Sequence, residues 1–240
     1  MEIKKALVFD IWGDYAHFKK IYVTTSALTY SLPFKTTIYG LIGAIIGLDN
    51  RKNGYLEYFN EENCHLAIQV INPVKIQRIN INLSPKPGPI KDNRKPTTME
   101  YIVKPHFRIF FTHSDEEIYN SLKENLEEKK TIYTPVLGLA HCIANFKFLG
   151  EYELTQESGN AMIDSILLKS QVNGLDTSTW NEKEVRIQEQ TMFPLEMNTT
   201  REVTKRDNVL FDLNGNPIQA EVEQYYNLNL DGKAVNIMMM

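Results

Sequence analysis

The strongest constraint on the fold is the way the spacing of apolar residues changes along the first 150 positions. Apolar residues alternate over 4–11, as in a strand, whereas from Ile38 to Ile46 they recur every three or four residues, as in an amphipathic helix. Two strand patterns, a second helix pattern and a last strand pattern follow, at 64–79, 100–111, 114–130 and 143–149. The predicted order of strand, helix, strand, strand, helix, strand is the ferredoxin-like βαββαβ motif, which RNA-recognition domains share.

The ends of the predicted helices carry signals of their own. Thr36 or Thr37 can cap the start of the first helix, and Gly47 can end it in a left-handed turn. Ser114 and Glu117 have the spacing of a capping box at the start of the second helix. These residues predict where both helices begin and where the first one ends.

Gly40 and Gly43 lie inside the first predicted helix, where a glycine costs about 1 kcal/mol relative to alanine. Because they are three residues apart, they clear one face of the helix for close approach by another part of the molecule. We expect that neighbour to be the sheet, and an RNA backbone is the alternative.

An insertion separates the second and third predicted strands. Residues 80–99 hold four prolines and one glycine among basic residues. Such a segment is a poor core element and favours an extended loop or a hairpin. An insertion of about twenty residues between two strands is usually either functional or disordered.

Residues 151–240 are more acidic and less periodic than the first 150. A strand is predicted over Val185–Phe193, and Val209–Leu213 and Ile218–Val222 flank Asn214-Gly215, a hairpin signal. We therefore expect an α+β protein with a ferredoxin-like domain at 1–150. A small β-rich domain or extension follows at 151–240.

Charge is divided unevenly along the chain. Residues 1–108 carry 15 Lys and Arg against 9 Asp and Glu, whereas residues 109–240 carry 11 against 21. The net charge of −4 therefore combines +6 in the first part with −10 in the second. Eight of the basic residues fall within 75–108, opposed only by Asp92 and Glu100, which predicts either a phosphate-binding surface or a solvated charged loop.

Side chains suited to single-stranded RNA gather in the same part of the chain. RNA of this kind is held by cations at its phosphates, flat side chains against its bases and polar groups at the base edges. We expect most of the aromatic residues there to be buried and Tyr15 and Phe18, which stand beside two lysines, to be exposed. The candidate RNA-binding residues are Tyr15, His17, Phe18, Lys19, Lys20, Lys35, Thr36, Thr37, Tyr39, Lys91, Arg94, Lys95, Lys104, His106 and Arg108.

Signatures of enzymes are weak. The sequence has no P-loop, no GxSxG and no HExxH pattern. His17, with Tyr15 and Lys19 nearby, could act as a general acid or base in RNA cleavage, and His106 beside Arg108 is a second candidate. We predict no catalytic residue.

Metal and membrane signals are also weak. Cys64-His65 and His141-Cys142 lack the spacing of a zinc site, so we expect buried thiols in strands, with no metal and no cofactor. The longest apolar run, Ile38 to Leu48, is too short to span a bilayer, and the N-terminus lacks a cleavage site. We expect a cytoplasmic protein.

Three ordered blocks of the chain resemble one protein family. Gly13-Asp14-Tyr15-Ala16-His17-Phe18 is similar to its G-x-x-A-x-F element, and Tyr30 to Gly43 is similar to Y-x-x-P-x-K-T-T-x-x-G-x-x-G. A third block comprises Tyr133 to Leu139 and Ala144. The family is the fifth CRISPR-associated protein family (Cas5) of type I Cascade complexes, and the resemblance is to the type I-B branch.

This resemblance implies a fold and a set of partners. The family has a ferredoxin-like domain with a β-hairpin thumb, which here corresponds to residues 78–104. Its members hold the 5′ handle of the crRNA, cap the seventh-family backbone filament and anchor the eighth-family large subunit near the target DNA. One branch, type I-C, cuts precursor crRNA without metal by means of a tyrosine, a lysine and a histidine. This chain has no Lys-His dipeptide, which favours the non-catalytic role.

Two further hypotheses stay open beside the non-catalytic RNA binder. One is a metal-independent endoribonuclease, and the other is a protein-binding scaffold without any RNA role, which the acidic C-terminal part would suit. The RNA-binding hypothesis requires that the basic arm and the loop after the first strand lie on the same side of the molecule.

Overall fold

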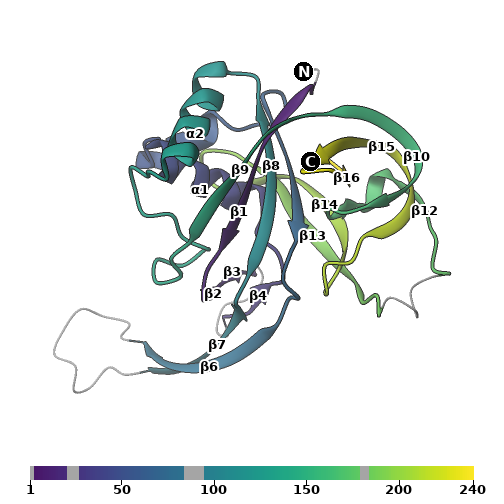
Figure 1. Cartoon of the computed structure of the whole chain (residues 1–240). Coiled ribbons are helices and arrows are strands. Elements are labelled where there is room, and N and C mark those ends of the chain that lie inside the picture. The colour runs from purple at the N-terminus through teal and green to yellow at the C-terminus, as the bar shows by residue number, and fades with distance from the viewer. Residues whose placement is uncertain (1–2, 21–26, 84–94, 179–183) are drawn as a thin grey trace.

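The computed structural model describes residues 3–20, 27–83, 95–178 and 184–240 (Figure 1). A four-stranded antiparallel sheet forms its centre, with the spatial order β5, β8, β1, β9. Its strands are β1 (Lys5–Trp12), β5 (Cys64–Val70), β8 (His106–His113) and β9 (Asn145–Glu153). Helix α1 (Lys35–Ile46) lies between β1 and β5 in sequence, and α2 (Glu116–Glu128) lies between β8 and β9. The strand–helix–strand–strand–helix–strand order predicted from the apolar spacing is confirmed.

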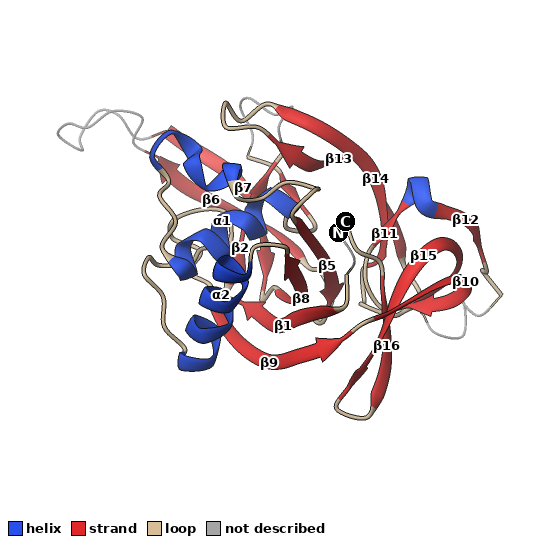
Figure 2. Ribbon diagram, turned by 90° about the horizontal axis from the view of Figure 1, so that it is seen from above, coloured by secondary structure: helices blue, strands red, loops and turns tan. Residues whose placement is uncertain are grey.

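Both helices pack on one face of this sheet (Figure 2). Alternate residues of β1, Leu7, Phe9 and Ile11, share a hydrophobic core with α1 and α2. In α2 that core takes up the predicted apolar stripe, which consists of Ile118, Leu122 and Leu126. The period of the sequence therefore placed these side chains correctly.

Each of the two longer strand patterns divides into two strands. Residues 64–79 form β5 and then β6 (Ile76–Leu83), and residues 100–111 belong to β7 (Lys95–Val103) and β8. The breaks contain Pro73 and Pro105, and a proline has no N–H to donate to a sheet. The expectation of single strands was wrong for this reason. The expected hairpin is confirmed, since β6 and β7 pair antiparallel from Ile76↔Ile102 to Leu83↔Lys95.

The helix starts differ from the predicted caps. Helix α1 begins after Phe34 without a side-chain cap, so Thr36 and Thr37 lie inside its first turn. At α2 the cap is Asp115, whose Oδ1 accepts a hydrogen bond from the Glu117 N–H at 2.8 Å, so the predicted Ser114 was wrong by one residue. Gly47 ends α1 with φ 83°, as predicted.

The two helical glycines face an aromatic side chain. A Cβ on Gly40 would lie 3.8 Å from the Tyr55 ring, and one on Gly43 would lie 3.6 Å from the Tyr55 Cβ. Tyr55 belongs to the 3-10 segment η1 (Arg51–Glu57). The expectation that the sheet fills this space was wrong, because η1 folds back across the helix first.

The C-terminal part is made of strands. Strands β10, β15, β12 and β16 form one sheet, and β11, β14 and β13 form another. Their bounds are β10 (Thr155–Ile163), β11 (Leu167–Leu168), β12 (Val172–Leu175), β13 (Ile187–Met197), β14 (Val203–Asp212), β15 (Ile218–Leu230) and β16 (Lys233–Ile237), with a 3-10 turn η2 (Lys169–Gln171). The strand predicted over Val185–Phe193 corresponds to β13, which begins two residues later and extends to Met197.

The predicted hairpin around Asn214-Gly215 is wrong in one respect. The turn exists, with Gly215 at φ 80°, but β14 and β15 belong to different sheets. A Cβ on Gly215 would lie 2.4 Å from the Val70 carbonyl oxygen, so the turn packs tightly against the end of β5. The division of the chain into domains at about residue 150 stays a prediction. One hydrophobic cluster includes Phe9 from the first part and Phe193 from the second.

Candidate nucleic-acid interface

The loop after β1 joins the sheet of the basic hairpin. Strand β2 (Tyr15–Ala16) pairs with β7 through Tyr15↔Val103 and Ala16↔Ile102, so the hairpin sheet has the order β2, β7, β6. The first sequence block and the base of the arm are therefore neighbours on one side of the molecule (Figure 1). This juxtaposition was required by the RNA-binding hypothesis, and it is confirmed.

The third sequence block closes over the first. The His17 N–H donates to the Leu137 carbonyl at 3.1 Å, and Gly138 adopts φ 93°. A Cβ on Gly138 would lie 2.0 Å from the His17 carbonyl oxygen, and one on Gly13 would lie 2.7 Å from the Ile143 carbonyl oxygen. Both glycines are needed for these close backbone approaches.

The second sequence block enters through a short strand pair. Strand β3 (Phe18–Lys19) pairs with β4 (Thr29–Tyr30), with Phe18 opposite Tyr30. The Thr29 hydroxyl accepts a hydrogen bond from the Phe18 N–H at 2.9 Å. All three blocks that carry the family resemblance thus meet beside the base of the hairpin.

Glu100, on β7, connects four segments at this junction. Its Oε1 accepts hydrogen bonds from Nε and Nη2 of Arg78, both at 3.2 Å, and its Oε2 accepts from the Thr29 N–H at 3.2 Å. Its carbonyl oxygen lies 2.7 Å from Nδ1 of His17, which acts as the donor because a carbonyl only accepts. The backbone N–H of Glu100 donates to Ala27 at 2.9 Å. Glu100 therefore fixes the base of the arm.

A group of aromatic and imidazole rings lies at the same junction. The Tyr101 ring centroid is 5.7 Å from that of Tyr15, 5.8 Å from that of His17 and 5.8 Å from that of His141. Tyr101 Oη is 3.0 Å from His141 Nε2. We call Tyr15, His17, Tyr101 and His141 the ring cluster. Tyr15 and His141 are its exposed members, and 41% of Tyr15 is accessible.

The buried members of the ring cluster are uncharged at neutral pH. Burial lowers the pKa of His17, against the hydrogen bond to Glu100, which raises it. Burial also raises the pKa of the Tyr101 phenol. His17 and Tyr101 thus add no charge behind the exposed rings of Tyr15 and His141, which are the ones accessible for stacking on bases.

Cations border the ring cluster. Lys19, Lys75 and Lys104 are exposed, and Arg78 is exposed although it pairs with Glu100. Lys95 is also exposed, but it lies opposite Leu83 at the far end of the hairpin from Tyr101. Lys20 is half-buried, with its Nζ 5.7 Å from the Tyr30 ring centroid. The predicted residues Lys91 and Arg94 lie outside the described residues.

Besides His17, which is buried in the ring cluster, four predicted RNA contacts are buried. Phe18 and Tyr39 are buried, and the Tyr39 ring stacks on Phe59 with centroids 4.8 Å apart. Thr36 is also buried, and Thr37 is half-buried in the first turn of α1. The expectation that Phe18 is exposed was wrong, because β3 turns this ring inward against Phe107.

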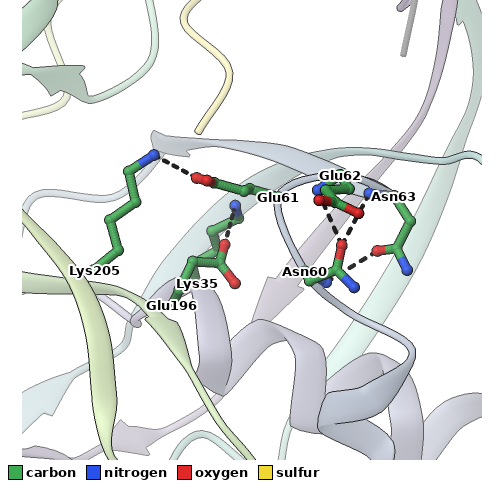
Figure 3. Close-up of polar contacts among 7 residues, drawn as sticks. All are labelled: Lys35, Asn60, Glu61, Glu62, Asn63, Glu196 and Lys205. Carbon is green, nitrogen blue, oxygen red and sulfur yellow. Dashed lines mark hydrogen bonds and ion pairs between the residues drawn. The ribbon is translucent and has the colours of Figure 1, made fainter.

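Lys35 is the fourth of these residues, and its ammonium pairs with a carboxylate of the C-terminal part. Only 2% of its side chain is exposed, and its Nζ lies 2.6 Å from Oε1 of Glu196 on β13 (Figure 3). Near it, Lys205 on β14 pairs with Glu61. Lys35 is therefore a contact between the two parts of the chain in this structure, and its side chain is closed to RNA.

His106 and Arg108 lie apart from the ring cluster. They project from β8 on the sheet face opposite the helices, where Arg108 binds both carboxylate oxygens of Asp10, at 2.7 and 3.1 Å. His106 Nε2 lies 3.2 Å from Oδ2 of Asp10. Burial acts to raise the pKa of Asp10, but the adjacent His106 imidazole and the hydrogen bonds from Arg108 hold it below the usual value.

Both cysteines are buried thiols. Cys64 lies in β5, as expected, whereas Cys142 lies in the loop before β9. Burial raises the pKa of Cys64 to about 12, so it is a thiol at neutral pH. Over the described ranges, no group of three or more His, Cys, Asp or Glu side chains is arranged to hold a metal ion. Nor is any described helix long and apolar enough to cross a membrane.

Sequence reasoning missed three residues of this interface. Glu100 was counted only as a charge, Tyr101 only as part of a strand and His141 only as half of a metal pair. A usable signal existed for His141, because it lies between Leu139 and Ala144, which both belong to the third block. No sequence signal pairs Tyr101 with His141, which are 40 positions apart.

Comparison with known proteins concerns the family and the fold of this chain. The family model described as CRISPR-associated protein (Cas_Cas5) matches residues 6–212. A CRISPR protein from Archaeoglobus fulgidus has a similar structure, with a TM-score of 0.55 and 13% identity over 97% of this chain and 98% of that one. A chain of a CRISPR RNA-guided surveillance complex has a TM-score of 0.50 and 10% identity, with 91% of each chain covered. At such identities the likeness concerns the fold alone, and no curated protein matches the sequence.

Proposed function

Since the chain belongs to the Cas5 family of CRISPR-associated proteins, we propose that it is a non-catalytic, cytoplasmic subunit of a type I-B CRISPR surveillance complex that binds the 5′ handle of the crRNA. In this proposal the central sheet and its helices are the ferredoxin-like domain, and β6 and β7 are its thumb. The seventh-family backbone subunit and the eighth-family large subunit are its protein partners, and target DNA passes nearby.

One observation carries the proposal. The three sequence blocks and the base of the basic hairpin meet at the ring cluster, where Tyr15 and His141 are exposed beside cations. A single strand of RNA presents phosphates and unstacked bases, and these are the groups that cations and exposed rings bind. The acidic C-terminal strands would repel the RNA and keep it on this side.

The test compares two RNAs that differ only in the handle. We expect the chain to bind a guide RNA with the repeat-derived 5′ handle at least about tenfold more tightly than one with a scrambled handle, a ratio equal to about 1.4 kcal/mol. Binding to the intact handle should weaken in Tyr15→Ala and remain unchanged in Tyr58→Ala, an exposed tyrosine that follows η1 and lies outside the three blocks. Equal affinity for both RNAs would contradict specific capture.

A second candidate is metal-independent cleavage of precursor crRNA. The hydroxyl of Tyr101 next to His141 Nε2 favours it, because a phenol and an imidazole in contact can move a proton without a metal. Incubation of the chain with precursor RNA in excess chelator decides between the two candidates. A site-specific product that is lost in His141→Gln would support the nuclease, and no product at any concentration of protein would exclude it.

A further inference from the structure

The face of the central sheet opposite the helices is organised in rows across its strands. The register aligns Ala67, Phe110, Val8 and Gly150 in the first row. Strands β15 and β16 cover this row, since Ala67, Phe110 and Val8 share a hydrophobic cluster with Leu228 and Ile237. At this end the sheet is therefore sealed on both faces.

The next two rows are polar and lie closer to the hairpin. The second row consists of Gln69 on β5, Arg108 on β8, Asp10 on β1 and Lys147 on β9. The third row consists of His106 on β8, Trp12 on β1 and Asn145 on β9. We call these seven residues the open-face site. Asn145 and Lys147 are exposed, and Trp12 and His106 are half-buried. Trp12 belongs to neither of the hydrophobic clusters found among the described residues.

The chemistry of these rows suits a nucleotide. The Trp12 indole is the flat surface, supported from one side by the His106 ring at 5.7 Å. Arg108 is held rigid and flat by its two hydrogen bonds to Asp10. The amide oxygen of Gln69 is buried without a hydrogen-bond partner among the described residues, which leaves an acceptor for an amino group.

The positive charge of the open-face site and its small apolar surface both favour RNA over a protein partner. Asp10 is neutralised by Arg108, and no described carboxylate pairs with Lys147 or with Lys104, which lies two residues before His106. The remaining charge is positive. A protein partner would require a broad apolar contact, and Trp12 is the one large apolar side chain in these two rows.

We propose that the open-face site binds a nucleotide of single-stranded RNA, with the base stacked on Trp12 and the phosphate near Lys147. It is distinct from the ring cluster, and the two are linked by Lys104, whose N–H donates to the Asp14 carbonyl at 2.8 Å. The inference rests on the proposed function, because it assigns a second contact to the same RNA.

The test uses the fluorescence of Trp12. In Trp180→Phe, Trp12 is the single tryptophan of the chain, and we expect handle-bearing guide RNA to quench its emission. Trp12→Leu should weaken RNA binding by about tenfold and Trp12→Phe by much less. Lys147→Gln should weaken binding and reduce its salt dependence, whereas Lys129→Gln, an exposed lysine at the end of α2, should change neither.

The outcomes separate this inference from the proposed function. Wild-type protein that binds no handle RNA would overturn both. Tight wild-type binding with unquenched emission and an unchanged affinity in Trp12→Leu would overturn the open-face site alone. Quenching by purified backbone or large subunit in the absence of RNA would show a protein-docking face and would also overturn it. Equal thermal midpoints of the variants would establish that they are folded.

Discussion

At the scale of single residues, Lys35 shows most clearly what a sequence leaves open. The lysine stands in a block that resembles an RNA-binding element, and its position alone gave no reason to expect burial. Its partner, Glu196, is 161 positions further along the chain. Sequence patterns relate residues only a few positions apart, so the ion pair could not be predicted. Tyr15 was predicted correctly as exposed because the loop around it lacks any apolar period.

The buried ion pair of Lys35 and Glu196 should hold the C-terminal strands against α1, and this can be tested by mutation. Glu196→Gln leaves the Lys35 ammonium buried without a counter-charge, so we expect a loss of about 3–5 kcal/mol in the free energy of unfolding. The double variant Lys35→Met/Glu196→Leu removes both charges and should recover most of that loss. Urea denaturation measures both values.

The matched control is the exposed pair of Lys169 and Glu189, with nitrogen and oxygen 2.8 Å apart. Glu189→Gln should cost less than about 1 kcal/mol. If Glu196→Gln cost no more than this control, the Lys35 pair would not hold the C-terminal strands against α1.

At the scale of elements, features set by nearby residues were predicted better than features set by contacts between distant segments. The helices and the proline-rich hairpin were predicted because spacing and turn residues act within a few positions. The strand boundaries at Pro73 and Pro105 were misjudged, because each proline lies in an otherwise continuous pattern. The sheet partners of β14 and β15 could not be predicted, because pairing depends on packing between distant segments.

At the hairpin, the direction in which Glu100→Gln changes the affinity for RNA distinguishes two roles of Glu100. If Glu100 positions the arm, Glu100→Gln should weaken binding of handle RNA by roughly tenfold, since it breaks the charged contact with Arg78. If Glu100 acts only as a negative charge near the RNA, its removal should strengthen binding. Filter binding at two salt concentrations measures the change. The control is Glu157→Gln, a carboxylate on β10.

The contact of α2 with the sheet gives a prediction about pH. Hydrogen bonds from Lys123, Lys5 and Tyr119 lower the pKa of Glu151 from 4.5 to about 2, against burial, which raises it. Its stabilising contribution is complete above pH 4.5 and is lost as the pH falls from 4.5 toward 2.

Urea unfolding of wild type and Glu151→Gln should therefore differ most at pH 7 and converge toward pH 2. The residue is partly exposed, so salt should reduce the difference. A difference that stays constant between pH 7 and pH 2.5 would contradict the assignment.

At the scale of the whole molecule, two features support each other. The sequence divides into a basic first part and an acidic second part, and the three resembling blocks, which are spread over 130 positions, meet at one place. The meeting place could be anticipated only through the family resemblance, since each block by itself is a short loop. The central claim is therefore that an RNA end is held beside the ring cluster at the base of the hairpin.

Photo-crosslinking tests that claim most directly. A guide RNA with a photoreactive base in its 5′ handle would be bound to the wild-type chain, irradiated and digested, and the adducts would be located by mass spectrometry. We predict adducts on Tyr15 and His141, the exposed members of the ring cluster. Adducts confined to strands β10, β15 and β16 of the C-terminal part would contradict this claim.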